Sequence, residues 1–355
     1  MRRLALAIVE GDPEAAAQAI SLRYVNADEP GIRRLRRGRA FAYVRADGTR
    51  VRDPATLSRI RSLAIPPAWA RVWVCTDPDG HLQATGFDAR GRKQYRYHGR
   101  WREIRDAAKY HRLVAFCHAL PRLRRQVTRD LACRCLCKRK VVATIVSLME
   151  RGQLRVGNDE YTRQNGSYGA TTLLDRHAEI RGPVIKLAYR GKSGILRRIR
   201  LVDQRLATIV RRCRDLPGQR LFQYVGGDGE PVAVTSTDVN EYLREVSGGP
   251  FTAKDYRTWA ATLACALLLS PREVPSSKRG IKLCVNEVLR TVAARLGHTP
   301  AICRSSYIHP GVFESFARGE LASLGRNAPE GIEVEALLAI EKKVAAILGK
   351  GARLA

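Results

Sequence analysis

The sequence predicts an α+β protein: a small N-terminal antiparallel β-sheet domain, then a larger, mostly α-helical domain with a small β-hairpin or three-stranded sheet. Three observations lead to this prediction. Short β-prone runs alternate with turn residues up to residue 97, and long runs of helical period follow Trp101. At 355 residues, the chain also exceeds the ~100–200 residues of a typical domain. We therefore expect two domains, with a boundary near residues 98–101.

The first domain is expected at residues 21–100, after an N-terminal extension of residues 1–20. Its strands are expected where β-branched and aromatic residues cluster, at Ala40–Val44, Val72–Thr76 and Leu82–Phe87. Turn pairs that end in glycine separate them, at Asp47-Gly48, Asp79-Gly80 and Arg90-Gly91. Such pairs favour tight hairpins, and hairpins join antiparallel strands.

The second domain is expected at residues 101–355. Apolar residues with a period near 3.6 predict helices at Ile104–Leu120, Arg122–Cys137, Val141–Arg151, Asp203–Cys213, Thr237–Val246, Tyr256–Leu269, Lys282–Leu296 and Val334–Leu348. One β-like segment, residues 178–201, interrupts them. In it, the runs Val184–Arg190 and Ile195–Leu201 flank Gly191-Lys192-Ser193-Gly194, which predicts a hairpin.

The charge of the chain points to a polyanionic partner. There are 63 Lys and Arg residues against 34 Asp and Glu, a formal net charge of +29. Most of the basic residues are arginine, whose planar guanidinium suits phosphate oxygens better than a lysine ammonium does. A bias toward arginine codons could explain the choice of arginine over lysine, but it does not explain the excess over acids. We therefore expect nucleic-acid binding.

The cysteines and the apolar segments indicate a protein of the reducing cytoplasm. None of the nine cysteines forms a Cys-x-x-Cys pair, so free and mostly buried thiols are expected. Cys133, Cys135 and Cys137 are assigned to a helix with buried thiols. The longest apolar stretch, Trp259–Ser270, is too short to cross a membrane and predicts a core helix. No membrane or metal partner is expected, and Asp77-Pro78-Asp79-Gly80 is interpreted as a surface turn.

Five polar residues beside element boundaries form a set that packing alone does not require. They are Arg155, Lys192, Arg257, His298 and Tyr307. Each has a simpler explanation when taken alone, as a helix cap, a turn lysine or a packed aromatic. Together they supply what attack on a phosphodiester needs: a nucleophile, cationic donors around the phosphate oxygens, and an acid for the departing oxygen.

In this order the five residues resemble the catalytic pentad of type IB DNA topoisomerases of the small bacterial, poxvirus-like kind, and the resemblance runs from about Tyr24 to Arg318. It implies the catalytic fold shared by tyrosine recombinases and these topoisomerases. It also implies the roles: the two arginines clamp the non-bridging oxygens, the histidine bonds one of them, the lysine protonates the leaving 5′ oxygen, and the tyrosine forms a 3′-phosphotyrosyl bond.

The resemblance implies further properties. The enzyme would relax positive and negative supercoils without ATP, metal or any other cofactor, as a monomer clamped around double-stranded DNA. Lys254 would bring a second lysine to the same phosphate, as a DNA-binding residue. Gln94, Tyr95 and Tyr97 match a strand that lies against the duplex, with Arg96 pointing the other way; an ordinary amphipathic edge strand is the alternative.

Two other functions fit part of the pattern. Tyrosine recombinases and integrases use a similar site, but they usually have His-x-x-Arg where this chain has Lys254-Asp255-Tyr256-Arg257. They also usually carry a helical domain ahead of the catalytic one, where this sequence predicts a β-sheet. A non-catalytic DNA-binding relative would keep the charge and the fold, and the intact pentad argues against it.

Overall fold

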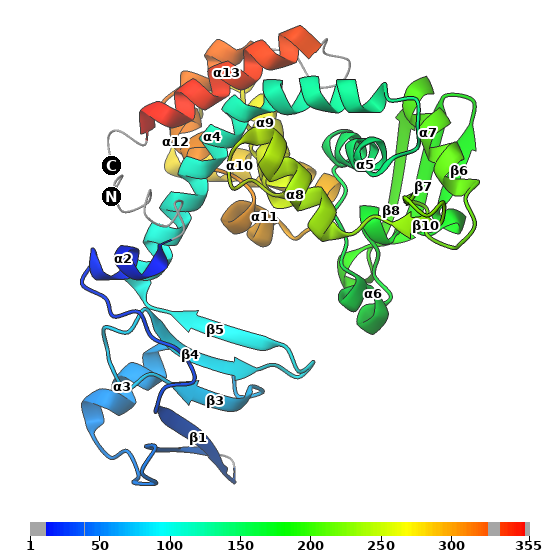
Figure 1. Cartoon of the computed structure of the whole chain (residues 1–355). Coiled ribbons are helices and arrows are strands. Elements are labelled where there is room, and N and C mark those ends of the chain that lie inside the picture. Colours follow the sequence, from blue (N-terminus) through cyan, green and yellow to red (C-terminus); the bar gives the residue numbers. More distant parts are fainter. Residues whose placement is uncertain (1–11, 39, 326–333, 352–355) are drawn as a thin grey trace. The chain divides into compact units, whose positions relative to one another are not determined.

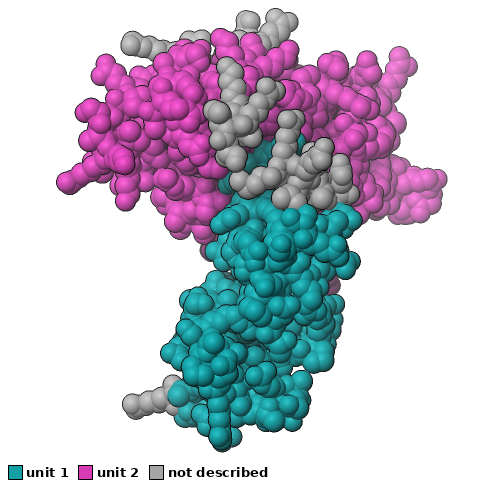
Figure 2. Space-filling model, turned by 90° about the vertical axis from the view of Figure 1, so that its left-hand side faces the viewer, with its two compact units in different colours: residues 1–112 teal, residues 113–355 magenta. Residues whose placement is uncertain are grey.

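The computed structural model describes residues 12–38, 40–325 and 334–351. It divides into two compact units, residues 1–112 and 113–355 (Figures 1 and 2). Helix α4 (Gly99–Leu131) begins in the first unit and ends in the second. The first unit is built on an antiparallel sheet, and the second is mainly helical with two small sheets, so the α+β prediction is confirmed.

The first unit contains a five-stranded sheet in the order β2-β1-β3-β4-β5. Its strands are β1 (Ile32–Arg37), β2 (Ala40–Val44), β3 (Ala70–Val74), β4 (Leu82–Phe87) and β5 (Lys93–Tyr97), all antiparallel to their neighbours. Two short helices accompany them, α2 (Pro13–Gln18) and α3 (Pro54–Ser62). Both begin with a proline behind an aspartate cap, an arrangement that satisfies free N–H groups of the first turn.

A small core holds α3 against one face of this sheet. Ile60 of α3 is buried with the inward-facing strand residues, which are Ile32, Val72, Val74 and Ala84, and with Val51. Strand β1 was not predicted because four of its six residues are arginines, which hide the period-2 pattern. Only Ile32 of this strand is fully buried, and pairing with β2 and β3 fixes its conformation.

The second unit is mainly helical (Figure 1). After α4 its helices are α5 (Lys138–Gly152), α6 (Asp159–Asn165), α7 (Gln204–Arg214), α8 (Ser236–Ser247), α9 (Ala253–Leu269), α10 (Lys278–Leu296), α11 (Pro300–Ser306), α12 (Gly311–Ala317) and α13 (Val334–Gly351). A three-stranded sheet in the order β6-β7-β8 comprises Ala178–Arg181, Val184–Arg190 and Leu196–Val202. A two-stranded sheet pairs β9 (Gln223–Val225) with β10 (Pro231–Ala233).

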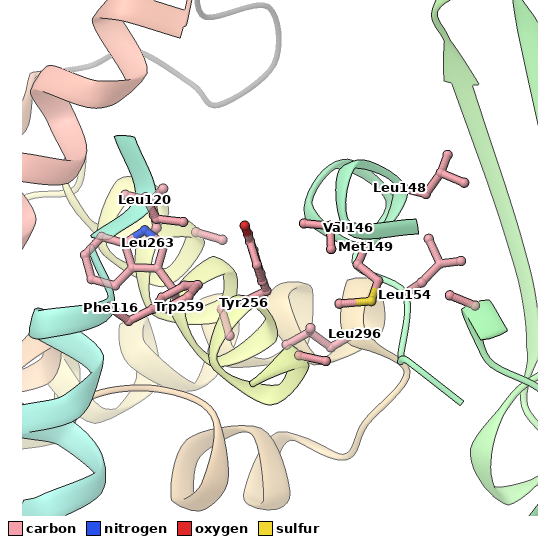
Figure 3. Close-up of a cluster of buried hydrophobic side chains, with 14 of the residues drawn as sticks. Phe116, Leu120, Val146, Leu148, Met149, Leu154, Tyr256, Trp259, Leu263 and Leu296 are labelled. Carbon is pink, nitrogen blue, oxygen red and sulfur yellow. The ribbon is translucent and has the colours of Figure 1, made fainter. Parts of the chain in front are cut away.

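Helix α9 forms the centre of the second unit's core. Fourteen of its 17 residues are buried, so it is enclosed on nearly every side. Figure 3 shows Tyr256, Trp259 and Leu263 of this helix among side chains from α4, α5 and α10. A helix this enclosed is held rigidly. It therefore gives a fixed support to the polar residues at its N-terminal end.

The link between α4 and α5 differs from the prediction. A single helix, α4, runs through Pro121 where a break was expected, because Leu120 and Leu123 on both sides of the proline are buried in the same core. The helix then ends at Leu131, short of the predicted Cys137. The assignment of the three cysteines to a buried helix is wrong. They lie in the following turn, where Cys135 is exposed and the other two are partly exposed.

The cysteines agree with the prediction of free and mostly buried thiols: all nine are free, and five of them are buried. In the described part of the chain, none of the helices combines the length and the apolar composition that a membrane crossing requires.

Candidate active site

Tyr307 ends the short helix α11 and is 8% exposed. Thr299 caps the start of this helix by accepting from the Ile302 N–H, and Pro300 fills its first position, where no N–H donor is needed. At the other end, the Tyr307 N–H donates to the Cys303 carbonyl at 3.0 Å. The local sequence thus builds a helix of seven residues, about two turns, that presents the tyrosine at its end.

Arg155 contacts both the hydroxyl of Tyr307 and the ring of His298. Arg155 Nη1 donates to the Tyr307 hydroxyl at 3.3 Å, and Arg155 Nη2 lies 2.7 Å from His298 Nε2. A guanidinium has no acceptor, so His298 Nε2 is the acceptor of that bond. The His298 and Tyr307 rings lie with their centroids 4.5 Å apart. Three of the five predicted residues, distant in sequence, are therefore in direct contact.

Local backbone geometry places Arg155 and His298. Helix α5 ends at Gln153 in the left-handed conformation (φ 51°), and the chain turns there into the segment that carries Arg155. Helix α10 ends at Gly297 (φ +65°), which frees the next residue, His298, to leave the helix axis. In both cases the functional residue follows a helix end.

Arg257 lies beneath this cluster and is 5% exposed. It projects from α9 and bonds two backbone carbonyls: Nη1 donates to Gln153 O, and Nη2 donates to Leu296 O at 2.8 Å. Its Nε is buried without a partner among the described residues. The guanidinium carbon stands 5.9 Å from the centre of the Tyr307 ring. Arg257 thereby joins the two helix ends that precede Arg155 and His298.

Lys254 lies in the first turn of α9, one turn before Arg257, and is exposed. Its charge acts on Tyr307, since it is one of the causes that lower the pKa of the tyrosine. Its neighbour Asp255 accepts bonds from the N–H and the hydroxyl of Thr252 at 2.8 and 3.0 Å, which closes a capping box at the start of α9.

Lys192 occupies the tip of the β7–β8 hairpin and is exposed. Its ammonium lies 5.9 Å from the centre of the Tyr161 ring. Lys192 also lines a small cavity together with Arg155 and Arg257, so it faces the same region as the two arginines. Among the contacts of the described residues, however, no hydrogen bond joins it to the Tyr307 cluster.

The concentration of positive charge changes the titration of the cluster. Burial raises the pKa of Tyr307, but the charges of Arg155, Arg257 and Lys254 and the bond from Arg155 outweigh it, so the pKa lies below its ordinary value of 10. Burial and the neighbouring cations, Arg155 first, lower the pKa of His298 to about 4. Burial and the charge of Arg155 lower the pKa of Arg257 to about 10. The tyrosine is therefore made more acidic, and the histidine is neutral near pH 7.

Sequence reasoning missed Thr262, a fully buried residue of α9. Its hydroxyl donates to the Tyr307 carbonyl at 3.3 Å and accepts from the His309 N–H at 3.1 Å. One side chain thus fixes the backbone on both sides of the nucleophile candidate. Thr262 stands in an apolar helix one turn beyond Arg257, and the sequence carries no sign that it contacts residues so far along the chain.

The candidate DNA-binding residues of the first unit do not share one face of the sheet. Tyr95 and Tyr97 stack with centroids 6.0 Å apart, and Tyr95 is 46% exposed. Gln94 alternates with them along β5 and bonds Asp88 Oδ2 at 3.0 Å. By strand alternation, Gln94 lies on the same side as Arg96, which bonds the Ala64 carbonyl.

Within residues 12–38, 40–325 and 334–351, no group of three or more His, Cys, Asp or Glu side chains is arranged to hold a metal ion.

Two family models and a viral relative match this chain. The family model of the eukaryotic DNA topoisomerase I catalytic core matches residues 98–321, a range that includes all five residues of the set. The model of the N-terminal domain of bacterial DNA topoisomerase IB matches residues 40–88. The DNA topoisomerase 1B of Acanthamoeba polyphaga mimivirus is 34% identical over 285 residues, which cover 78% of this chain and 85% of the relative.

A helical unit that gathers cationic side chains around a tyrosine is an arrangement suited to attack on a phosphodiester. The family matches are more specific: the chain belongs to the type IB DNA topoisomerases and is a type I DNA topoisomerase. They favour this function over the recombinase, since both matched families are topoisomerases.

Proposed function

We propose that the chain relaxes positive and negative supercoils by cutting one DNA strand with Tyr307 and resealing it. The observation that supports this most is the contact of Arg155 with both the Tyr307 hydroxyl and His298. A phosphodiester placed at that hydroxyl would meet cationic donors on the side where charge develops in the transition state.

Cleavage would exchange one phosphorus–oxygen bond for another. The Tyr307 hydroxyl loses its proton to solvent, its oxygen bonds to phosphorus, and the bond between phosphorus and the 5′ oxygen breaks. Lys192 gives a proton to the departing 5′ oxygen, and the 3′ phosphate stays on the tyrosine. Resealing is the reverse. One phosphodiester replaces another at similar energy, so the reaction needs no ATP. The cationic side chains around the phosphate would supply the charge stabilisation that a metal ion provides in other enzymes.

The contacts of Arg155 and Arg257 support one arrangement of the bound phosphate. Arg155 now donates to His298 Nε2. A non-bridging oxygen would replace His298 as the acceptor, which leaves Nε2 free to carry the proton and donate to the phosphate. Arg257 already has a buried Nε with no partner among the described residues, and this group would donate to the second oxygen. Lys254 would stabilise the same phosphate from the exposed end of α9.

Duplex DNA would contact both units. We place a DNA-binding β domain at residues 21–100 and a catalytic domain at residues 101–355. Tyr95, Tyr97 and Gln94 would bind DNA in the first. We propose that a monomer acts in the bacterial cytoplasm, on the nucleoid. The net charge of +29 supports binding that weakens steeply with salt, because phosphate contacts release counterions.

The decisive experiment is relaxation of negatively and positively supercoiled plasmid in EDTA without ATP, with Tyr307→Phe in parallel. We expect the wild type to relax both substrates and to leave a covalent adduct on a labelled 3′ phosphate. Tyr307→Phe should bind DNA as well as the wild type but form no adduct. Relaxation by the variant, or a requirement for a divalent ion, would overturn the mechanism.

A further inference from the structure

Few contacts hold the tip of the β7–β8 hairpin in place. Lys192, Ser193, Gly194 and Ile195 are all exposed, and the turn has positive φ at Ser193 (65°) and Gly194 (74°). An exposed turn of this kind has few contacts that could set the direction of Lys192. A proton donor, in contrast, must be held within hydrogen-bond reach of its acceptor. Some other contact of the hairpin has to provide that precision.

Arg197 of β8 makes such a contact. It lies five residues after Lys192, directly across the hairpin from Tyr189. Its Nη1 donates to the carbonyl of Arg295 at 2.7 Å. That carbonyl belongs to the last turn of α10, whose carbonyls have no partner within the helix. The bond therefore joins the hairpin that carries Lys192 to the helix end that precedes His298.

Two glycines leave room for this side chain. A Cβ at Gly191 would lie 3.1 Å from Arg197 Cγ, and a Cβ at Gly297 would lie 3.3 Å from Arg197 Nη1. Both distances are tighter than ordinary carbon contacts. Gly191 immediately precedes Lys192, and Gly297 immediately precedes His298. The side chain of Arg197 thus passes against the backbone beside both residues.

A second arginine binds the next carbonyl of the same helix end. Arg257 Nη2 donates to Leu296 O at 2.8 Å, next to the Arg295 carbonyl that Arg197 binds. Arg197 and Arg257 line one cavity together with Arg155 and Lys192. Two guanidinium groups therefore bind the end of α10. That of Arg257 comes from the Tyr307 cluster, and that of Arg197 comes from the hairpin.

We propose that Arg197 is a positioning residue that holds the β7–β8 hairpin against the C-terminal end of α10, so that Lys192 points at the leaving 5′ oxygen. This inference rests on the proposed role of Lys192 as the acid. Arg197 acts through Lys192 and not on the phosphate itself. It follows that removing Arg197 impairs protonation of the leaving group and leaves the hydrogen bonds of the Tyr307 cluster in place.

The test is single-turnover cleavage at saturating enzyme with two DNA substrates, one normal and one with sulfur in place of the bridging 5′ oxygen. The sulfur leaves as a thiolate and needs no acid. We expect Arg197→Gln to cleave the normal substrate about 10²-fold more slowly, the loss typical of a misplaced catalytic group. On the sulfur substrate its rate should return to within a few-fold of the wild type, as for Lys192→Ala.

Two further variants complete the design. Arg198→Gln removes an equal charge from the neighbouring exposed position of β8 and should keep the wild-type rate at saturating enzyme on both substrates. Gly191→Ala keeps Arg197 but crowds its Cγ, so it should slow the normal substrate less than Arg197→Gln does, again with recovery on sulfur. It also serves if Arg197→Gln fails to fold.

The outcomes separate the two proposals. If the wild type forms no adduct with either substrate, the proposed function itself fails. If the wild type is active and Arg197→Gln matches it, the inference about Arg197 is overturned. Equal slowing on the oxygen and sulfur substrates also overturns it, because Arg197 would then act on the phosphate or on the fold and not through the acid.

Discussion

The Tyr307 cluster and the tip of the β7–β8 hairpin differ in burial. Tyr307 and Arg257 are 8% and 5% exposed, and Arg155 links the tyrosine to His298. Lys192 is exposed at the tip of a turn. The cluster is anchored on α9, whose 17 residues are almost all buried, whereas the hairpin reaches α10 through Arg197.

The difference separates two chemical tasks. Electrostatic stabilisation requires donors that are fixed before the reaction, because reorienting them during the reaction costs free energy. Burial fixes them here, even though it brings several cations together. Proton transfer requires contact with one leaving atom, which is present only when DNA is bound. An exposed hairpin tip allows that contact to form on binding.

The largest expected effect is that of Arg155→Ala, which removes the link within the cluster. We expect cleavage to slow by about 10²–10³-fold, the usual loss of one preorganised donor. Arg155 also lowers the pKa of Tyr307, so the rate of the variant should rise with pH only at higher pH than the wild-type rate does. Single-turnover pH profiles would show this. Arg163→Ala, on the exposed surface of nearby α6, is the matched control and should leave the profile unchanged.

The next effect concerns the anchor of the cluster. Thr262→Val keeps the shape of the side chain but removes its bonds to the Tyr307 carbonyl and the His309 N–H. Leaving buried backbone groups unpaired should lower the free energy of unfolding by about 1–3 kcal/mol, measured by urea denaturation. Cleavage should slow as well. Thr208→Val, an exposed threonine that bonds its own helix, provides the comparison; an equal loss there would refute the anchoring role.

A smaller effect is expected in the first unit, where the residues are exposed. Tyr95→Ala should weaken DNA binding by about twofold to tenfold, the range of one hydrogen bond, without changing the cleavage rate at saturating enzyme. Gln94→Ala tests the opposite face of the strand. If Tyr95 faces the duplex, Gln94→Ala should weaken binding less, because Gln94 is bonded to Asp88. The reverse order would assign the DNA to the other face.

A further effect is expected on stability in acid. The pKa of His298 is about 4 in the folded chain against 6.5 for an ordinary histidine. Below about pH 6.5 the unfolded chain therefore takes up a proton that the folded chain does not, and stability is lost as the pH falls toward 4. His298→Gln should make the urea midpoint less dependent on pH in this window. If the urea midpoint of the variant changed with pH as steeply as that of the wild type, groups other than His298 would control the loss of stability in acid.

The sequence determined the elements whose signals are local. The glycine-bracketed turn at Lys192 defined the hairpin, and the helical period over Lys282–Leu296 ended at the residue where α10 ends, because such signals depend on neighbouring residues alone. The same local reading failed at Pro121, where packing of α4 overrides the proline, and at the three-cysteine turn.

The order of the pentad in the sequence indicated which residues belong together, but only the tertiary structure decided how they meet. Arg155 bridges Tyr307 and His298. Thr262 holds the backbone around Tyr307, and Arg197 reaches the end of α10. The partners in these contacts are 45 to 152 positions apart in the chain. Such contacts depend on how whole helices pack, and no periodicity or spacing encodes them. The physical reason is that hydrogen bonds act over about 3 Å, a distance that the fold and not the residue pattern sets.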